Sequence, residues 1–344
     1  MITRRHFGKG VLAGVPGLLA LATKWESFAA DGQLVATWSP GASGANFKKS
    51  FADTFKQAEV RIIGQYDGPR LTQMQANRSS PTVDIAVFTN VTTPLVMRSD
   101  LISPLDVKKI PNLSKVDPKT AFSNHLGAPV TYGCWGILYN AERVKTPIES
   151  WGDLLRADLK GHVSTANVTY SSSLCTVDAL ARLHGGSVKS PERGLEMIRQ
   201  IRLSGPGLWD QDNIAFGWLK TGELWATPCN SAQLQHLLRD PDIPKLKFVA
   251  PKEGGYYLGF NVVKVANAPH PDLADQFINH MLDAQWQALL PKVGNTRPTN
   301  VDVAVPPAVA ELVPPAANLH DLDWDYLAKN RRQLTNEWDR IVNA

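Results

Sequence analysis

The sequence predicts an α/β protein built from two blocks. Near-continuous apolar runs such as 84–88 are typical of parallel strands buried on both faces, and amphipathic helical patterns separate these runs. Strand, helix and strand in alternation indicate right-handed βαβ units. A length of 344 residues suggests about two domains. The 43% hydrophobic content excludes a disordered chain, and three cysteines exclude a disulfide-dense scaffold.

The first block ends near residue 133 and alternates strands with helices. Phe47, Phe51 and Phe55 recur every four residues, which predicts one face of a helix. Ser43, in the turn-like segment before them, is a plausible N-cap for this helix. We expect strands at 34–38, 59–63 and 84–88, and a second helix at 71–76.

The second block covers about 134–250, and the chain then continues into further helices. Pro271 opens a helix that we expect to continue to Leu290, since proline is favoured in a first helical turn. A Pro- and Ala-rich connection at 306–315 precedes the last helix at 325–342. We expect extended runs at 129–133, 136–140, 162–165, 222–227 and 256–263, and helices beginning near 146 and spanning 174–184 and 191–202.

Residues 1–29 have the features of a cleaved export signal. A basic start with Arg4 and Arg5 precedes an apolar run at 11–22, which is too short to span about 30 Å of hydrocarbon. Small residues favour cleavage after Ala29. The order Thr-Arg-Arg-x-Phe-x-Lys resembles the signal read by the twin-arginine export machinery, although a general secretory signal with incidental arginines is the alternative. We expect a mature protein in the periplasm.

The charge balance gives no argument for a nucleic-acid or membrane partner. The net charge is +4, of which the leader carries +3, so the remainder is close to neutral. Beyond the leader, no apolar stretch approaches 18 residues, so no transmembrane helix is expected in the body.

The motifs of common catalytic and metal sites are missing. The zinc-protease, Walker and G-x-S-x-G patterns do not occur, and the eight histidines show no i, i+3 or i, i+4 pairs. We therefore expect no enzyme activity, no cofactor and no metal. Cys134, Cys175 and Cys229 lack a C-x-x-C spacing, which favours small buried hydrophobic side chains over a disulfide.

Polar and aromatic residues follow several predicted strands. Ligands of open α/β sheets bind beyond the carboxyl ends of strands, where helix N-termini present free N–H groups. The alternative for the serines is simple helix capping, and for the aromatic residues it is packing. The candidate ligand-binding residues are Trp38, Ser39, Thr89, Asn90, Asn167, Tyr170, Ser171, Ser172 and Asn230, with Tyr256 and Tyr257, which as strand neighbours point to opposite faces.

Three segments resemble a known family. Ser150-Trp151-Gly152-Asp153-Leu154-Leu155, followed by Leu159-Lys160-Gly161-His162-Val163, is similar to a segment of bacterial extracellular solute-binding proteins. Pro251-Lys252-Glu253-Gly254-Gly255 resembles the P-x-E-G-G of the spermidine/putrescine-binding group. The run 271–290 and the turn at 294–300 resemble the closing helix of that group and the turn after it.

The resemblance implies two α/β lobes joined by crossing hinge strands, with a ligand cleft between them. Lobe 1 would take 30–133 and 251–300, and lobe 2 would take 134–250 and 301–344. A monomer of this kind captures a small solute by hinge closure and delivers it to the permease of an ABC transporter in the inner membrane.

The ligand is less defined than the fold. Polyamine binders resemble this chain at Trp38, but Pro40 and Gly41 stand where they carry an acid, and their Trp and Asp after E-G-G fall near Leu258 and Phe260. Without anionic partners, burying two ammonium groups is unfavourable, so we expect no tight binding of putrescine or spermidine and favour an anionic or zwitterionic solute. The alternatives are a ferric-iron binder using Tyr170, Tyr256 or Tyr257, and a periplasmic hydrolase using Cys134 or Cys175 with a histidine.

Overall fold

The computed structural model describes residues 32–122, 124–170 and 172–344. The export signal expected at 1–29, with its twin-arginine motif, lies outside these residues, as does Ser171. Across the described ranges, no helix combines the length and the apolar character that a bilayer crossing requires.

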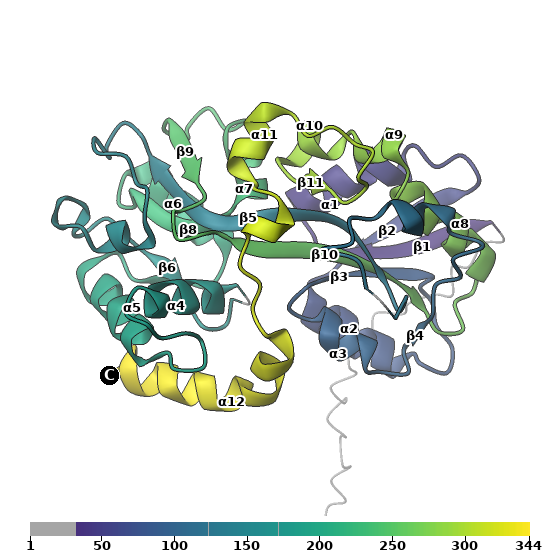
Figure 1. Ribbon diagram of the computed structural model, residues 1–344, viewed down its shortest axis with the longest axis horizontal. Coiled ribbons are helices and arrows are strands. Elements are labelled where there is room, and N and C mark those ends of the chain that lie inside the picture. The colour runs from purple at the N-terminus through teal and green to yellow at the C-terminus, as the bar shows by residue number, and fades with distance from the viewer. Residues whose placement is uncertain (1–31, 123, 171) are drawn as a thin grey trace, which may run out of the picture.

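Two long strands cross from one half of the molecule to the other (Figure 1). They are β5 (Ala128–Asn140) and β10 (Tyr256–Val265), which pair antiparallel. The first part of β5 also pairs with β11 (Arg297–Pro298), while its second part pairs with β8 (Ala226–Asn230) and β9 (Leu246–Val249). Residues 129–133 and 136–140, which we expect to form one extended run, both lie in β5, and this strand pairs with strands of both lobes.

The sheet of lobe 1 confirms the predicted parallel βαβ units. Strands β1 (Gln33–Trp38), β2 (Glu59–Gly64) and β3 (Ile85–Thr89) are parallel, and β10 pairs antiparallel with β3. The order across the sheet is β11-β5-β10-β3-β1-β2, with the short β4 (Ile102–Ser103) on β10. Since β1, β2 and β3 run the same way, their carboxyl ends share one edge.

Lobe 1 has a hydrophobic core on each face of this sheet. Alternate residues of a strand point to opposite faces, so Leu34 and Trp38 join one core with Phe47, while Val35 joins the other with Phe88. The helices of this lobe are α1 (Ala42–Phe47), which continues into a π-helical stretch (Lys48–Ala52), α2 (Asp67–Ala76), α3 (Thr93–Met97), α8 (Pro271–Met281), α9 (Ala284–Gln287) and α10 (Leu290–Gly294), with a 3-10 helix at Pro111–Lys115.

Lobe 2 is organised around one core that contains four fully buried tryptophans: Trp135, Trp151, Trp209 and Trp338. A two-stranded parallel sheet of β6 (Thr165–Ala166) and β7 (Leu208–Trp209) lies beside β8. The helices are α4 (Ser173–Arg182), α5 (Glu192–Ser204), α6 (Asp212–Thr221), α7 (Ser231–Leu237), α11 (Pro307–Leu312) and α12 (Trp324–Ile341), with 3-10 helices at Trp151–Leu155, Ala157–Leu159 and Ala316–Asn318.

The C-terminal segment returns to lobe 2 after the chain has passed through lobe 1. It crosses the hinge strands before α12, as Figure 1 shows. Trp338 buries the last helix in the core of lobe 2. The lobe bounds expected from the resemblance remain a prediction.

Three local expectations need correction. Gly41, not Ser43, is the N-cap of α1, because the Ser43 hydroxyl accepts a hydrogen bond from Trp38 Nε1 instead. The helix expected at 271–290 divides, since Asp283 caps a new helix through the N–H of Gln285. The connection at 306–315 contains the short helix α11.

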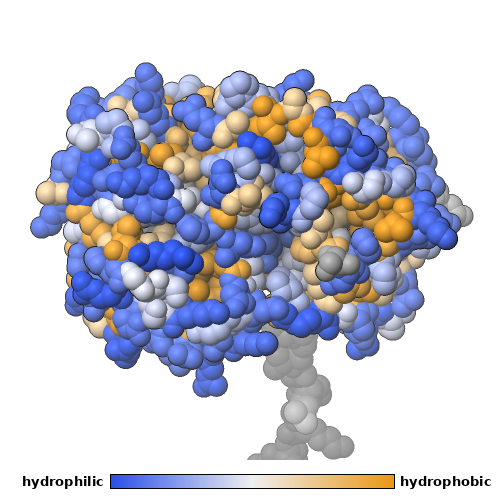
Figure 2. Space-filling view, viewed as in Figure 1, coloured by the Kyte–Doolittle hydropathy of each residue, from blue (hydrophilic) through white to orange (hydrophobic). Residues whose placement is uncertain are grey.

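On the face drawn in Figure 2, hydrophilic residues predominate and hydrophobic side chains form separate groups.

Candidate functional site

The strand ends of the two lobes carry the polar residues that the sequence singles out. In lobe 1, Ser39 follows β1, and the segment 65–67 follows β2. In lobe 2, Asn167 follows β6 and Asn230 ends β8. Burial is the main cause of the raised pKa of Tyr170 in lobe 2, and the phenol of Tyr66 in lobe 1 makes a small contribution in the same direction, which is consistent with facing edges.

Trp38 is the last residue of β1 and is almost fully buried. Its ring stacks on Phe47 at 4.1 Å and on Phe260 at 5.5 Å between centroids, and its Nε1 donates to Ser43 Oγ at 2.8 Å. Ser39, the next residue, is half-buried. The contacts of Trp38 are those of a packing residue that fixes the β1–α1 turn.

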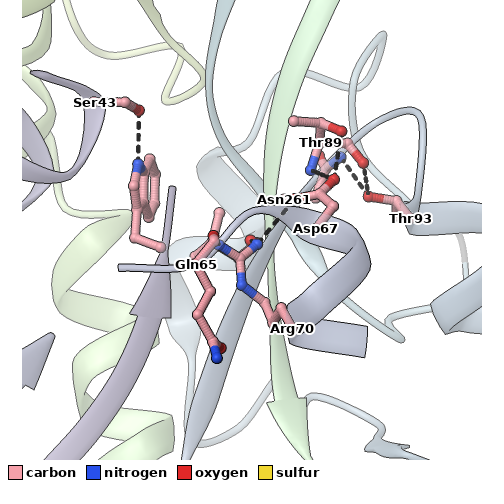
Figure 3. Close-up of polar contacts among 9 residues, drawn as sticks. Ser43, Gln65, Asp67, Arg70, Thr89, Thr93 and Asn261 are labelled. Carbon is pink, nitrogen blue, oxygen red and sulfur yellow. Dashed lines mark hydrogen bonds and ion pairs between the residues drawn. The ribbon is translucent and has the colours of Figure 1, made fainter. Parts of the chain in front are cut away.

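Thr89, at the end of β3, is held by the carboxylate of Asp67, the first residue of α2 (Figure 3). Asp67 Oδ2 accepts from the Thr89 N–H at 3.0 Å and from its hydroxyl at 2.6 Å. The other oxygen of Asp67 accepts from Arg70 Nη1 at 3.0 Å. Arg70 is fully buried, and its guanidinium also donates to the carbonyls of Gln65 and Val87. This network ties the ends of β2 and β3 together.

Tyr170 and Asp212 form a polar pair on lobe 2. The Tyr170 hydroxyl lies 3.2 Å and 3.3 Å from the two carboxylate oxygens of Asp212, and Gln233 Nε2 donates to the same carboxylate at 3.3 Å. Burial raises the pKa of Asp212 to about 6, while the hydrogen bond from Tyr170 opposes that shift. At neutral pH this carboxylate is an acceptor that favours a hydrogen-bond donor or a cation.

The sequence reasoning missed Tyr66, Asp212 and Gln233. Tyr66 is 70% exposed, an unusual position for a large aromatic side chain. Asp212 is the first residue of α6, and an acid at a helix start was the available signal. The preceding strand, β7, is only two residues long, so no strand pattern in the sequence marks this helix start.

The remaining lobe 2 candidates lie at the N-termini of α4 and α7 or in the segment before α4. Ser172 is the N-cap residue of α4, but its side chain makes no capping hydrogen bond, and the buried hydroxyl of Ser173 has no partner among the described residues. Asn230 caps α7 by accepting from the N–H of Ala232 at 3.0 Å. Asn167 accepts from the N–H of Val168 at 2.6 Å.

Tyr256 and Tyr257 point to opposite faces of β10, as expected. The Tyr256 hydroxyl donates to Asp178 Oδ2 at 2.7 Å inside lobe 2, and its ring contacts Trp151. Tyr257 lies on the other face with Tyr132, 5.0 Å away between centroids. Asn90 donates to the carbonyl of Tyr257 at 3.0 Å. Tyr257 and Asn90 therefore lie together, apart from Tyr170.

The geometry gives the two alternative functions no support. Tyr170 and Tyr256 donate to different carboxylates, so the three tyrosines do not converge on one ion. Among the residues described, no group of three or more His, Cys, Asp or Glu side chains is placed to hold a metal. Burial raises the pKa of the Cys134 thiol to about 12 and also raises that of Cys175, which disfavours a thiolate nucleophile.

Comparisons with known proteins agree with this architecture. A family model described as bacterial extracellular solute-binding protein matches residues 80–330. The thiamine-binding periplasmic protein of Salmonella typhimurium is 24% identical over 332 residues, which cover 93% of this chain and 92% of that protein. The thiamine-binding periplasmic protein of Brucella abortus is 22% identical over 312 residues, covering 88% of each.

Solved structures share the fold. An ABC transporter substrate-binding protein from Bradyrhizobium japonicum superposes with a TM-score of 0.77 at 16% identity, covering 90% of this chain and 99% of that one. A periplasmic thiamin binding protein superposes with a TM-score of 0.69 at 18% identity, covering 90% of this chain and 96% of that one. These neighbours confirm the expected two-lobed α/β fold.

Proposed function

We propose that this chain, which belongs to the bacterial extracellular solute-binding protein family, captures an organic cation with an aromatic ring, such as thiamine. Family membership confirms the resemblance seen in the sequence. The chain is the solute-binding component of an ABC importer in this proposal, and it passes its ligand unchanged to a membrane permease. Export by the twin-arginine route, a periplasmic location and a monomeric state are parts of the same proposal.

The observation that carries the ligand class is the Asp212 carboxylate beside Tyr170. It is held by Tyr170 and Gln233 on lobe 2, and Tyr66 approaches from lobe 1. A cation between these rings would gain from both the carboxylate and the aromatic faces. The relatives described above are thiamine-binding periplasmic proteins, and thiamine carries a cationic thiazolium ring joined by a methylene group to a neutral pyrimidine ring.

The anionic or zwitterionic solute favoured by the sequence is the second candidate. The helix start at Ser172 and Ser173 supports it, because neither hydroxyl makes a capping bond and helix N-termini favour negative charge. A ligand with a cationic ring and a separate anionic group would use both ends of the site.

Closure follows from the position of the residues on both lobes. A ligand that contacts Tyr66 and Tyr170 together interacts fully only when the strand ends are close. Its differential affinity then favours the closed form, and β5 and β10 supply the hinge.

Calorimetric titration of the mature protein tests this proposal. We expect thiamine to bind and putrescine and spermidine to bind at least about tenfold more weakly, since a single carboxylate cannot pair two ammonium groups. Tyr66→Ala should weaken thiamine binding by about tenfold, while Leu203→Ala, at another exposed apolar residue on α5, should leave it unchanged. Absence of any thiamine binding contradicts the proposal.

A further inference from the structure

A second cavity lies on the other face of the hinge strands from Trp135 and Tyr170. Its volume is about 550 Å³, and it is bounded by α3, β10, the segment before β5 and the C-terminal segment at 316–325. Tyr257 forms part of its wall, together with Asn90 and Asn261. Of the candidate ligand residues, Asn90 and Tyr257 line this cavity, whereas Trp38, Ser39, Tyr170 and Asn230 do not.

Strand geometry separates this cavity from the cleft. Tyr256 is paired with Trp135 across β10 and β5, so both point to the face that carries Tyr170. Tyr257 points the opposite way and packs against Tyr132, whose hydroxyl accepts from the N–H of Ala316 at 3.1 Å. The C-terminal segment therefore closes the cavity on the far side of the hinge.

Two buried amide side chains in the cavity wall have unused acceptors. Asn261 is 1% exposed and donates to Thr93 Oγ1 at 3.0 Å, and Asn90 is 6% exposed and donates to Tyr257 O and to Asp321 Oδ1. These donations fix which way each amide points. Both carbonyl oxygens are buried and have no hydrogen-bond partner among the described residues. A buried acceptor of this kind favours an N–H or O–H donor from a ligand.

The charges in the wall are mixed, because the cations Arg98 and Lys119 line it together with Asp321, Asp323 and Asp325. Asp321 accepts from Asn90 and from Trp324 Nε1, but no ion pair is seen for it within the described chain. The neighbouring acids Asp323 and Asp325 pair with Lys189 and Arg98. Apolar side chains complete the wall: Pro94, Met97, Phe122, Leu322 and Trp324.

We propose that this cavity is a second binding site, for a small primary ammonium compound with an apolar body. The ammonium group would donate to Asp321 and to the amide oxygens of Asn90 and Asn261, and the apolar body would contact Met97 and Trp324. The site is independent of the ligand proposed for the cleft. Because Asn261 belongs to lobe 1 and Trp324 to the core of lobe 2, its occupant contacts both lobes.

Titration with 2-phenylethylammonium tests the site on the mature protein. We expect saturable binding that weakens at least tenfold in Asp321→Asn and is unchanged in Asp302→Asn, an exposed acid paired with Lys115. The trimethylated form of the probe, which lacks N–H donors, should bind at least tenfold more weakly. Met97→Trp, which fills the cavity from α3, should also abolish binding. This variant replaces Asp321→Asn as the test if Asp321→Asn fails to fold.

The cleft is the competing location for this probe. Asp212→Asn should leave the affinity for 2-phenylethylammonium unchanged if the cavity is occupied. Loss of binding in Asp212→Asn with retention in Asp321→Asn would place the probe in the cleft and overturn the proposal. No detectable binding to the unmodified chain would overturn it as well. Failure of thiamine to bind would leave this result unaffected.

Discussion

The hydroxyl of Tyr170 donates to Asp212 across 3.2 Å, at the point where lobe 2 faces lobe 1. This bond couples an aromatic ring to a carboxylate whose pKa burial has raised to about 6. The pair therefore changes charge within a pH range that is accessible to experiment. It also makes the affinity for a cation depend on pH.

Thiamine affinity should fall as the pH is lowered through 6. Protonated Asp212 offers no negative charge to a cation. With a pKa of about 6, roughly one Asp212 carboxyl in ten is still ionised at about pH 5. Calorimetry at about pH 5 and about pH 8 should show an approximately tenfold difference. In Asp212→Asn the affinity should be low at both values. Equal pH dependence in this variant and the unmodified protein would show that another group titrates.

In the ligand-free protein, the contribution of Asp212 to the free energy of unfolding should fall as the pH rises, whereas thiamine affinity should rise with pH. Its pKa is raised in the folded state, so its contribution is fully present below the unfolded value of about 4 and is lost as the pH rises through 6. At about pH 8, Asp212→Asn should therefore raise the free energy of unfolding by about 1–3 kcal/mol. At about pH 4 it should change that free energy little. Urea denaturation at both values measures this. A variant that is less stable at the higher pH would contradict the assignment.

Tyr256→Phe should separate a packing role from a ligand role. Removal of the hydroxyl leaves Asp178 without one charge-assisted donor, which should cost about 1.5–3 kcal/mol of unfolding free energy. Thiamine affinity should be unchanged, because this hydroxyl lies inside lobe 2. Tyr139→Phe offers a control on the neighbouring strand, because the Tyr139 hydroxyl bonds to the neutral backbone of Ile148 rather than to a carboxylate, so a smaller loss is expected. A large loss of affinity in Tyr256→Phe would return Tyr256 to the site.

Regular patterns in the sequence predicted most of the fold. The spacing of Phe47 and Phe51 predicted a buried helical face, and both residues are buried although the helix becomes π-helical between them. The break after Met281 was harder to predict, because local capping by Asp283 competes with an apolar pattern that continues past it.

The ligand site was harder to predict from the sequence than the fold, for a physical reason. Apolar periodicity reports which residues are buried, but a ligand site depends on which strand ends face each other across a hinge. Tyr66 and Asp212 are separated by well over a hundred residues and follow strands of different lobes. The pairing of β5 with β10 joins the lobes, and Tyr66 and Asp212 both influence the pKa of Tyr170.

Export of the full chain should depend on Arg4 and Arg5. Replacing both with lysine keeps the positive charge that a general secretory signal needs but removes the paired guanidinium groups of the twin-arginine motif. We expect the precursor to accumulate in the cytoplasm, as cell fractionation would show. Lys9→Arg, which also preserves charge, serves as the control. Normal export of the doubly substituted chain would favour the general secretory route.

Asp67→Ala should destabilise lobe 1 because it removes the carboxylate partner of the fully buried Arg70. Loss of one member of a buried pair costs about 3–5 kcal/mol, and Thr89 also loses the acceptor of two hydrogen bonds. Asp53→Ala removes an exposed acid paired with Lys48 and should cost less than about 1 kcal/mol. Denaturant unfolding of both variants measures the difference. Similar losses in the two would show that Arg70 is held by the carbonyls of Gln65 and Val87 alone, and that Asp67 is free to contact a ligand.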